Sequence, residues 1–145
     1  MRLFLAYLTV IIQFSTLVFI LVTAPVIAES VRGILVQVAG LFIGGMAVFT
    51  LGIGNFKIAP LVKINGRFID KGIYSLIRHP MYLSLILITF ALVSDYFSWL
   101  RLLIAILLCL TLLAKLHIEE FYLNRYYNQY EDYMKRTHRL IPFLY

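Results

Sequence analysis

The sequence predicts an all-α integral membrane bundle of about four transmembrane helices, followed by an interfacial C-terminal helix on the cytoplasmic side. Of its 145 residues, 62% are hydrophobic and the mean hydropathy is +0.91, whereas soluble domains contain about 45–50% apolar residues. Uncharged runs cover residues 3–28 and 33–56, and each exceeds the ~20 residues that a spanning helix needs. Shorter uncharged runs follow at 80–94 and 102–114. We therefore expect residues 1–145 to form one membrane domain.

The first two spans are expected at residues 3–24 and 33–54. The sequence VIAES at the end of the first run resembles a signal-peptidase site. The apolar run before it is, however, longer than the ~7–15 residues of a signal core, so we favour a retained span. The second span contains glycines that we expect to allow close packing between helices. These are Gly40, Gly44 and Gly45.

The third and fourth spans are expected at residues 80–97 and 99–117, as a tight hairpin with aromatic residues at its turn, a typical membrane-interface feature. Pro80 fits the first position of the third helix, where its missing N–H costs nothing. The following segment, residues 118–136, carries Leu and Tyr at helical spacing. This pattern predicts an amphipathic helix that lies on the membrane surface.

The distribution of charge predicts the orientation in the membrane. The chain has thirteen Lys and Arg against seven Asp and Glu, and the excess gathers between residues 55 and 79. The basic residues of this segment are Lys57, Lys63, Arg67, Lys71 and Arg78. A basic loop of this kind faces the cytoplasm, so four spans place both termini there. We expect a prokaryotic inner membrane, because the chain is short and its loops are compact.

Composition also limits the partners and ligands. We expect the basic excess to mark cytoplasmic loops rather than nucleic-acid binding, so the lipid bilayer is the expected partner. Cys109 is the only cysteine, and it has no Cys or His at a metal-binding spacing. We expect no metal site. The sequence does not predict the oligomeric state.

Two separated polar segments are expected to meet at one membrane face. Arg78 and His79 directly precede Pro80, and the N–H groups of a helix start favour negative charge. The antiparallel hairpin returns Glu119 and Glu120 to the same depth. Each of these charges also fits a structural role as an interfacial anchor or ion-pair partner, because charges commonly flank membrane spans.

The motifs GIYSLIRHPMY, EEFYL and YEDYMKRTHRLIP together resemble the isoprenylcysteine carboxyl methyltransferase family, whose relatives include the phospholipid N-methyltransferases. The resemblance covers roughly residues 55–142. The matching residues are Gly72, Tyr74, Arg78, His79, Pro80, Tyr82, Glu119, Glu120, Leu123, Tyr130, Tyr133 and Pro142.

The resemblance implies methyl transfer from S-adenosylmethionine to a lipophilic, membrane-associated acceptor, without a Rossmann domain. The cofactor-binding residues that it implies are Gly66, Arg67, Phe68, Ile69, Tyr74, His79, Pro80, Met81, Tyr82 and Glu119. The catalytic candidates are Arg78, His79 and Glu120. Lys115 stands where the family carries a substrate-contacting basic residue, usually arginine; lysine keeps the charge but loses the bidentate fork.

The chemistry of methyl transfer assigns hypothetical roles to these residues. Either glutamate, Glu119 or Glu120, suits the amino group of the methionyl moiety, and helix N-terminal amides with Arg78 suit its carboxylate. Tyr74 and Tyr82 suit the adenine or, by cation–π contact, the sulfonium. A carboxylate acceptor needs no base, whereas an amine acceptor needs a proton acceptor, for which His79 or a glutamate is the candidate.

Two other functions remain open at the level of the sequence. One is an NADPH-dependent membrane reductase related to the sterol reductases, whose C-terminal helices resemble this family. The other is a non-catalytic membrane subunit that has kept the fold. The sequence distinguishes neither the methyl acceptor nor O-, N- and S-methylation.

Overall fold

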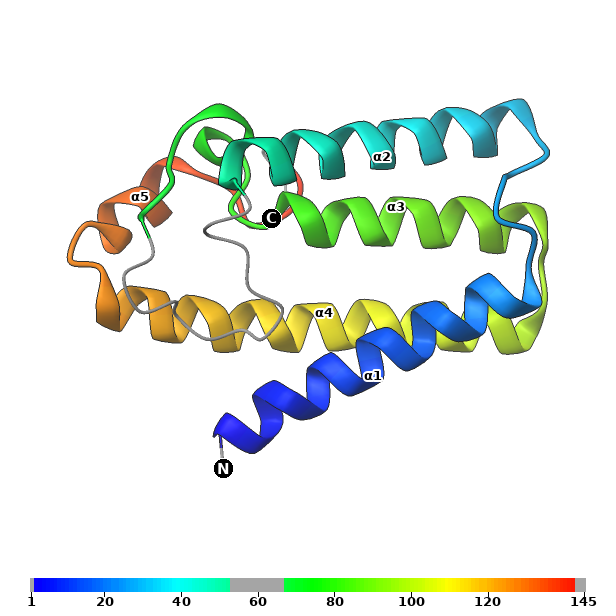
Figure 1. Ribbon diagram of the computed structural model, residues 1–145, viewed down its shortest axis with the longest axis horizontal. Coiled ribbons are helices and arrows are strands. Elements are labelled where there is room, and N and C mark those ends of the chain that lie inside the picture. Colours follow the sequence, from blue (N-terminus) through cyan, green and yellow to red (C-terminus); the bar gives the residue numbers. More distant parts are fainter. Residues whose placement is uncertain (1, 53–66, 143–145) are drawn as a thin grey trace.

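The computed structural model describes residues 2–52 and 67–142, and within these ranges the chain is helical and contains no strand. The predicted all-α class is therefore confirmed. Figure 1 shows the helices running back and forth along one long axis. They are α1 (Arg2–Thr23), α2 (Val31–Leu51), α3 (Pro80–Asp95), α4 (Trp99–Tyr126) and α5 (Tyr130–Arg136), with a short 3₁₀ helix, η2 (Gly72–Ser75), before α3.

Three of the described helices, α1, α2 and α4, are long and apolar enough to cross a membrane. The helix α3 has 16 residues, and at 1.5 Å per residue it is about 24 Å long, somewhat shorter than the ~30 Å hydrocarbon core. It begins at Pro80, as expected from the preference of proline for the first position of a helix, and it lies alongside α2 (Figure 1). The bundle thus consists of three long apolar helices and one shorter apolar helix.

The contact between α2 and α3 depends on two of the three α2 glycines that we expected to allow close packing. Ser84 of α3 donates a hydrogen bond to the carbonyl of Gly40 at 2.7 Å. A Cβ on Gly40 would lie 2.9 Å from Cγ1 of Ile88, and a Cβ on Gly44 would lie 2.5 Å from the Ser84 hydroxyl. Gly45 has open space around it. Close packing therefore needs Gly40 and Gly44 but not Gly45.

The end of the bundle opposite α5 is closed by polar caps over an apolar core. Asp95 accepts hydrogen bonds from the backbone N–H groups of Glu29 and Ser30, each at 2.7 Å, and from the Ser30 hydroxyl. Arg101 donates to the carbonyl of Thr23. These bonds connect the ends of α1 and α3 to the starts of α4 and α2. The core beneath them contains Ile20, Ala28, Leu92, Val93 and Ala105.

The helix α4 continues past residue 117, where we expected the fourth span to end, and it reaches Tyr126. The segment expected as one interfacial helix, 118–136, therefore divides into the last turns of α4 and the short α5. Glu120, which lies in these last turns, pairs with Arg78 and Arg139. Tyr130 and Tyr133 are buried, so α5 packs against the bundle with the face that we had expected to lie on the membrane.

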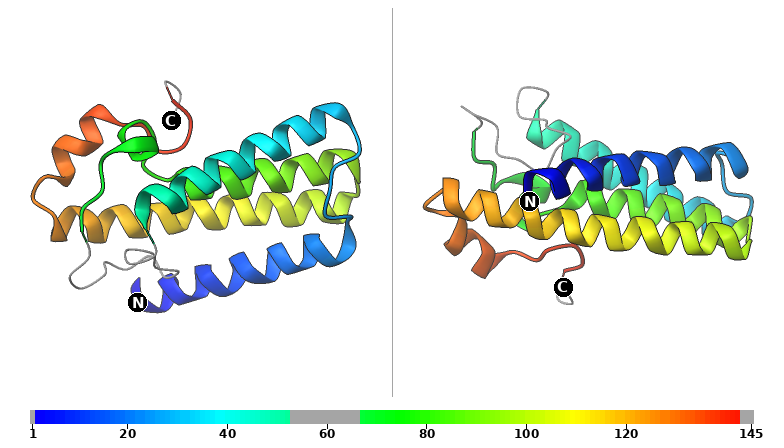
Figure 2. Two further views of the ribbon diagram at one scale, coloured as in Figure 1. Left: turned by 45° about the horizontal axis from the view of Figure 1, so that its top comes forward. Right: turned by 90° about the horizontal axis from the view of Figure 1, so that it is seen from below.

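The chain after α5 returns to the segment before α3. The N–H of Arg78 donates to the carbonyl of His138 at 2.8 Å, and the N–H of His79 donates to Arg139 at 3.0 Å. Figure 2 shows α5 and the C-terminal tail at the end of the bundle where α3 begins. In the same views α1 lies against α4, and α2 lies against α3.

Candidate functional site

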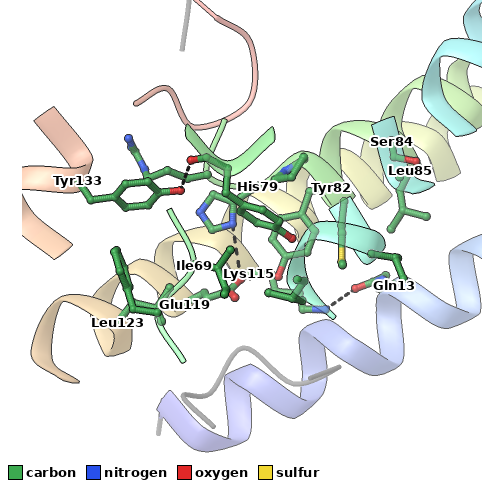
Figure 3. Close-up of a pocket in the computed structure, with 18 of the residues that line it drawn as sticks. Gln13, Ile69, His79, Tyr82, Ser84, Leu85, Lys115, Glu119, Leu123 and Tyr133 are labelled. Atoms are coloured by element: carbon green, nitrogen blue, oxygen red, sulfur yellow. Dashed lines mark hydrogen bonds and ion pairs between the residues drawn. The ribbon is translucent and has the colours of Figure 1, made fainter. Parts of the chain in front are cut away.

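A cavity of about 460 Å³ lies at the end of the bundle where α3 begins, between α1, α2, α3 and α4 (Figure 3). Most of the residues predicted from the sequence lie in its wall. These are Arg67, Phe68, Ile69, Tyr74, Arg78, His79, Pro80, Met81, Tyr82, Lys115 and Glu119. Glu120 lies outside the wall, and Gly66 lies outside the described residues.

The turn before α3 is shaped by a glycine in a left-handed conformation. Gly72 has φ = 60°, a backbone conformation that residues other than glycine rarely adopt. A Cβ at this position would lie 2.9 Å from the side chain of Thr50 in α2. Gly72 thus lets η2 approach α2 closely, and this approach brings Tyr74 into the cavity wall.

The polar centre of the cavity is formed by His79, Tyr82 and Glu119. The His79 ring stacks on the Tyr82 ring, with centroids 5.2 Å apart and planes within 8°. The Tyr82 hydroxyl donates to Oε2 of Glu119 at 2.7 Å, and Nδ1 of His79 lies 3.6 Å from the same oxygen. The Glu119 side chain is 32% exposed. Within the described residues, its Oε1 accepts no hydrogen bond from the protein, so Glu119 still has acceptor capacity for a ligand.

His79 is a buried imidazole between two carboxylates. Burial lowers its pKa, but the neighbouring carboxylates of Glu119 and Glu120 raise it, and the net result is a raised pKa. Its Nε2 lies 3.5 Å from Oε1 of Glu120, too far for a good hydrogen bond, and has no hydrogen-bond partner among the described residues. A raised pKa favours the charged imidazolium, which suits a structural cation better than a proton acceptor.

Glu120 joins two arginines behind this centre. Its Oε1 accepts from Nε of Arg78 at 2.7 Å, and its Oε2 accepts from Nε of Arg139 at 3.0 Å. Nη1 of Arg78 also donates to the carbonyls of Thr137 and Met134. The side chains of Arg78 and Glu120 are each 7% exposed. This buried network fixes the C-terminal tail against α3 and α4, and it leaves Glu120 facing arginines instead of the cavity.

An aromatic cluster holds the loop before η2 in place. The Phe68 ring lies 5.2 Å from those of Tyr127 and Tyr133 and 6.2 Å from that of Tyr130. The Tyr133 hydroxyl donates to the carbonyl of Tyr74 at 2.6 Å. Burial raises the pKa of Tyr74, Tyr130 and Tyr133, so these phenols are neutral hydrogen-bond donors. They give the cavity an aromatic wall near Arg67, Phe68 and Ile69.

Lys115 is buried deeper in the bundle, and its partner comes from α1. Its Nζ donates to Oε1 of Gln13 at 2.6 Å and lies 5.3 Å from the centre of the Tyr82 ring. The sequence-based prediction missed Gln13. The signal for it was a polar side chain inside an uncharged apolar run, which commonly marks a functional position in a membrane helix.

The remaining wall of the cavity is apolar, and the sequence-based prediction missed it as well. It is formed by Phe14 and Leu17 of α1, Val48 and Leu51 of α2, and Leu85 of α3. These residues extend the cavity away from the charged centre and along the helices. Among the described residues, no group of three His, Cys, Asp or Glu side chains is placed to hold a metal ion.

Comparison with known proteins gives a family. The model of the phospholipid methyltransferase family matches residues 28–130, which is more than half of the chain and contains both the turn before α3 and the two glutamates of α4. The phospholipid methyltransferases are related to the family that the motifs resemble, so the predicted relationship is confirmed. A search among curated proteins finds no match.

Proposed function

Because this chain belongs to the phospholipid methyltransferase family and is an integral membrane protein, we propose that it transfers a methyl group from S-adenosylmethionine to a lipophilic, membrane-associated acceptor. The observation that carries the proposal is the cavity at the start of α3, where a partly exposed carboxylate, stacked rings and an apolar wall meet. Its volume lies within the ~300–1,000 Å³ typical of small-molecule sites.

The residues of the cavity fit the cofactor by their chemistry. S-adenosylmethionine supplies a methyl group that its sulfonium has already activated. Glu119 offers a carboxylate oxygen for the cofactor's ammonium group, a charge-assisted contact. The rings of Tyr74 and Tyr82 offer faces for adenine or for a cation. Because the methyl group is activated, the protein's main task is to hold the acceptor and the methyl group in line.

Arg78, His79 and Glu120 have positioning roles in this proposal. His79 supports the Tyr82 ring by stacking and balances the charge of Glu119. Arg78 and Glu120 hold the start of α3 against α4 and the C-terminal tail. Most polar atoms of Arg78 and Glu120 are engaged by protein groups, which argues against direct contact of these two residues with the reacting atoms. The positioning role of His79 rests on its stacking against Tyr82 and its place between the two carboxylates. If the acceptor is an amine, Glu119 is the carboxylate best placed to take its proton.

The acceptor is proposed to enter along the apolar wall between α1, α2 and α3. We place the charged end of the cavity at the cytoplasmic face of a prokaryotic inner membrane, because most of the described basic residues, among them Arg78, Arg136 and Arg139, lie at this end. The start of α1 and the helix α5 lie at this same end (Figure 1), as cytoplasmic termini require.

A titration with two cofactors tests the proposal. We expect the purified protein in lipid nanodiscs to bind S-adenosylmethionine and to show no saturable binding of NADPH, which a related reductase would need. Glu119→Gln should weaken S-adenosylmethionine binding about tenfold or more, equivalent to ~1.4 kcal/mol or more. The control is Glu131→Gln, which removes the same charge from a side chain that is 71% exposed on α5. Saturable NADPH binding, or no binding of S-adenosylmethionine, would contradict the proposal.

A further inference from the structure

The pair formed by Gln13 and Lys115 lies in the part of the cavity that has no assigned role in cofactor binding. Building on the proposed function, we propose that Gln13 is a specificity-determining residue: together with Lys115 it binds an oxyanion of the methyl acceptor. The two residues come from α1 and α4 and face each other across the cavity wall (Figure 3).

The first argument is an incomplete charge balance. Lys115 is 3% exposed and Gln13 is 7% exposed. The only hydrogen bond from Nζ within the described residues goes to the uncharged amide of Gln13, with the Tyr82 ring as a weaker partner. No described acid lies within ion-pair distance of Nζ. Glu119 acts on Lys115 electrostatically at longer range, and its carboxylate is hydrogen-bonded to Tyr82. Buried ammonium groups in proteins are normally paired with an anion.

The second argument concerns the hydrogen-bond donors that remain. An ammonium has three donors, and Gln13 uses one of them. The amide Nε2 of Gln13 adds donors for which the described residues provide no acceptor. Lys115 and Gln13 therefore present several hydrogen-bond donors, whereas the carbonyl oxygen of Gln13 is already bonded to Lys115. An oxyanion is the ligand that complements such a site.

The third argument is the apolar surroundings. Phe14 and Leu17 of α1 line the cavity beside Gln13, and Leu85 and Val48 line it from the other side. An anion that carries an apolar chain gains free energy by burying that chain against these side chains, a gain that a free inorganic ion does not have. The site therefore fits an anion that is attached to a hydrocarbon chain and not a free inorganic ion.

The fourth argument is the distance from the proposed cofactor contact. Lys115 and Glu119 lie four residues apart on one face of α4, so their Cβ atoms are separated by about 5–6 Å. An acceptor whose oxyanion rests on Lys115 can bring a neighbouring nucleophile toward Glu119. Gln13 lies outside the family match at 28–130. The helix α1 therefore affects which acceptor binds, whereas the rest of the site is formed mainly by residues of the matched region.

Acceptors of different charge test this inference in the full-length protein in nanodiscs. The probes are phosphatidylethanolamine, which carries a phosphodiester, a farnesylated cysteine, which carries a carboxylate, and a long-chain primary alkylamine, which carries no anion. The variants are Gln13→Leu and Gln13→Glu; the latter keeps the size of the side chain and gives Lys115 an internal anion. The control is Gln37→Leu, since Gln37 is a buried glutamine that bonds Ala28 and Val26 at the opposite end of the bundle.

We expect the wild type to prefer one of the two anionic acceptors over the alkylamine. Both Gln13 variants should raise KM for that acceptor about tenfold or more, while kcat, the KM for the alkylamine and the affinity for S-adenosylmethionine change less than about twofold. The inference is overturned if Gln13→Glu behaves like the Gln37 control, or if the wild type prefers the alkylamine. A wild type that binds no S-adenosylmethionine would instead contradict the proposed function itself.

Discussion

His79 connects the residues of the site to the residues that hold it together. On one side it lies near Glu119 and Tyr82, in the cavity wall, and on the other it lies near Glu120, in the buried ion-pair network. Its backbone N–H is bonded to the C-terminal tail. A change in the charge of this ring therefore acts on both cofactor binding and stability.

The titration of His79 gives a prediction of pH dependence. Because its pKa in the folded protein is raised above 6.5, its ion pairs stabilise the fold fully below the unfolded value of about 6.5. This stabilisation is lost as pH rises through the raised pKa. NMR of labelled imidazole, assigned with His79→Gln, should show a midpoint above 6.5 that falls in Glu120→Gln. A midpoint at or below 6.5 in the wild type would contradict the geometry.

Glu119 and Glu120 are adjacent in sequence, but we expect their substitutions to have different effects. Glu120→Ala removes the carboxylate that accepts hydrogen bonds from Arg78 and Arg139. Arg78 and Glu120 are both buried, and the loss of one partner of a buried ion pair costs about 3–5 kcal/mol. Thermal unfolding should show this loss, whereas S-adenosylmethionine affinity at low temperature should fall only about threefold or less. Glu119→Gln should show the opposite pattern, with weak binding and a smaller shift of the unfolding midpoint than Glu120→Ala, because the Glu119 side chain is 32% exposed. Equal effects of both substitutions on binding would argue for direct contact by both glutamates.

At the scale of the element, the pair formed by α2 and α3 supports the cavity from one side. Gly40 and Gly44 allow the two helices to approach closely, and Ser84 bonds across the contact. The position of α3 sets the positions of His79 and Tyr82 at its start. Helix packing is therefore linked to the geometry of the cavity.

Two glycines of α2 provide a matched test of this packing. Gly40→Ala forces a Cβ to within 2.9 Å of Ile88, and overpacking of this kind costs about 1–3 kcal/mol. Gly45→Ala adds the same atom in open space and should stabilise the helix by roughly 0.5–1 kcal/mol. Thermal unfolding in one detergent measures both variants. If Gly40→Ala is as stable as Gly45→Ala, the close contact between α2 and α3 is not required.

The sequence predicted those elements whose signals are local. The start of α3 was predictable because Pro80 favours the first turn of a helix. The end of α4 was not, because the expected bound rested on the end of the apolar run, whereas the helix continues through Glu120, which pairs with Arg78 and Arg139. The spacing of Tyr130 and Tyr133 predicted one helix face. It did not predict that this face would pack against Phe68.

At the scale of the whole molecule, the polar caps around Asp95 and Arg101 close one end of the bundle. The opposite end encloses the cavity. The site combines residues from different helices, and the sequence predicted only some of these contacts between helices. The hairpin of the third and fourth spans brought the turn before α3 and Glu119 together by topology alone. Gln13 was missed because it lies 102 positions from Lys115, and no local pattern predicts which helix α1 packs against.

The membrane orientation gives a prediction for the whole chain. In a Cys109→Ala background, Lys135→Cys places a thiol on α5, where the native side chain is 65% exposed, and Phe97→Cys places one at the opposite end. A membrane-impermeant maleimide should label the first only in inverted vesicles and the second only in intact cells. Labelling of both thiols from the same side would contradict an arrangement in which the termini and the cavity share the cytoplasmic face.

Transfer of a labelled methyl group tests the central claim most directly. The purified protein is incubated with methyl-labelled S-adenosylmethionine and a native membrane extract, and mass spectrometry identifies the labelled molecules. We expect the label in a lipophilic acceptor, with the yield strongly reduced by Glu119→Gln and unchanged by Glu131→Gln. No label in any lipophilic molecule, or equal labelling by the wild type and Glu119→Gln, would contradict a methyl-transfer site at the start of α3.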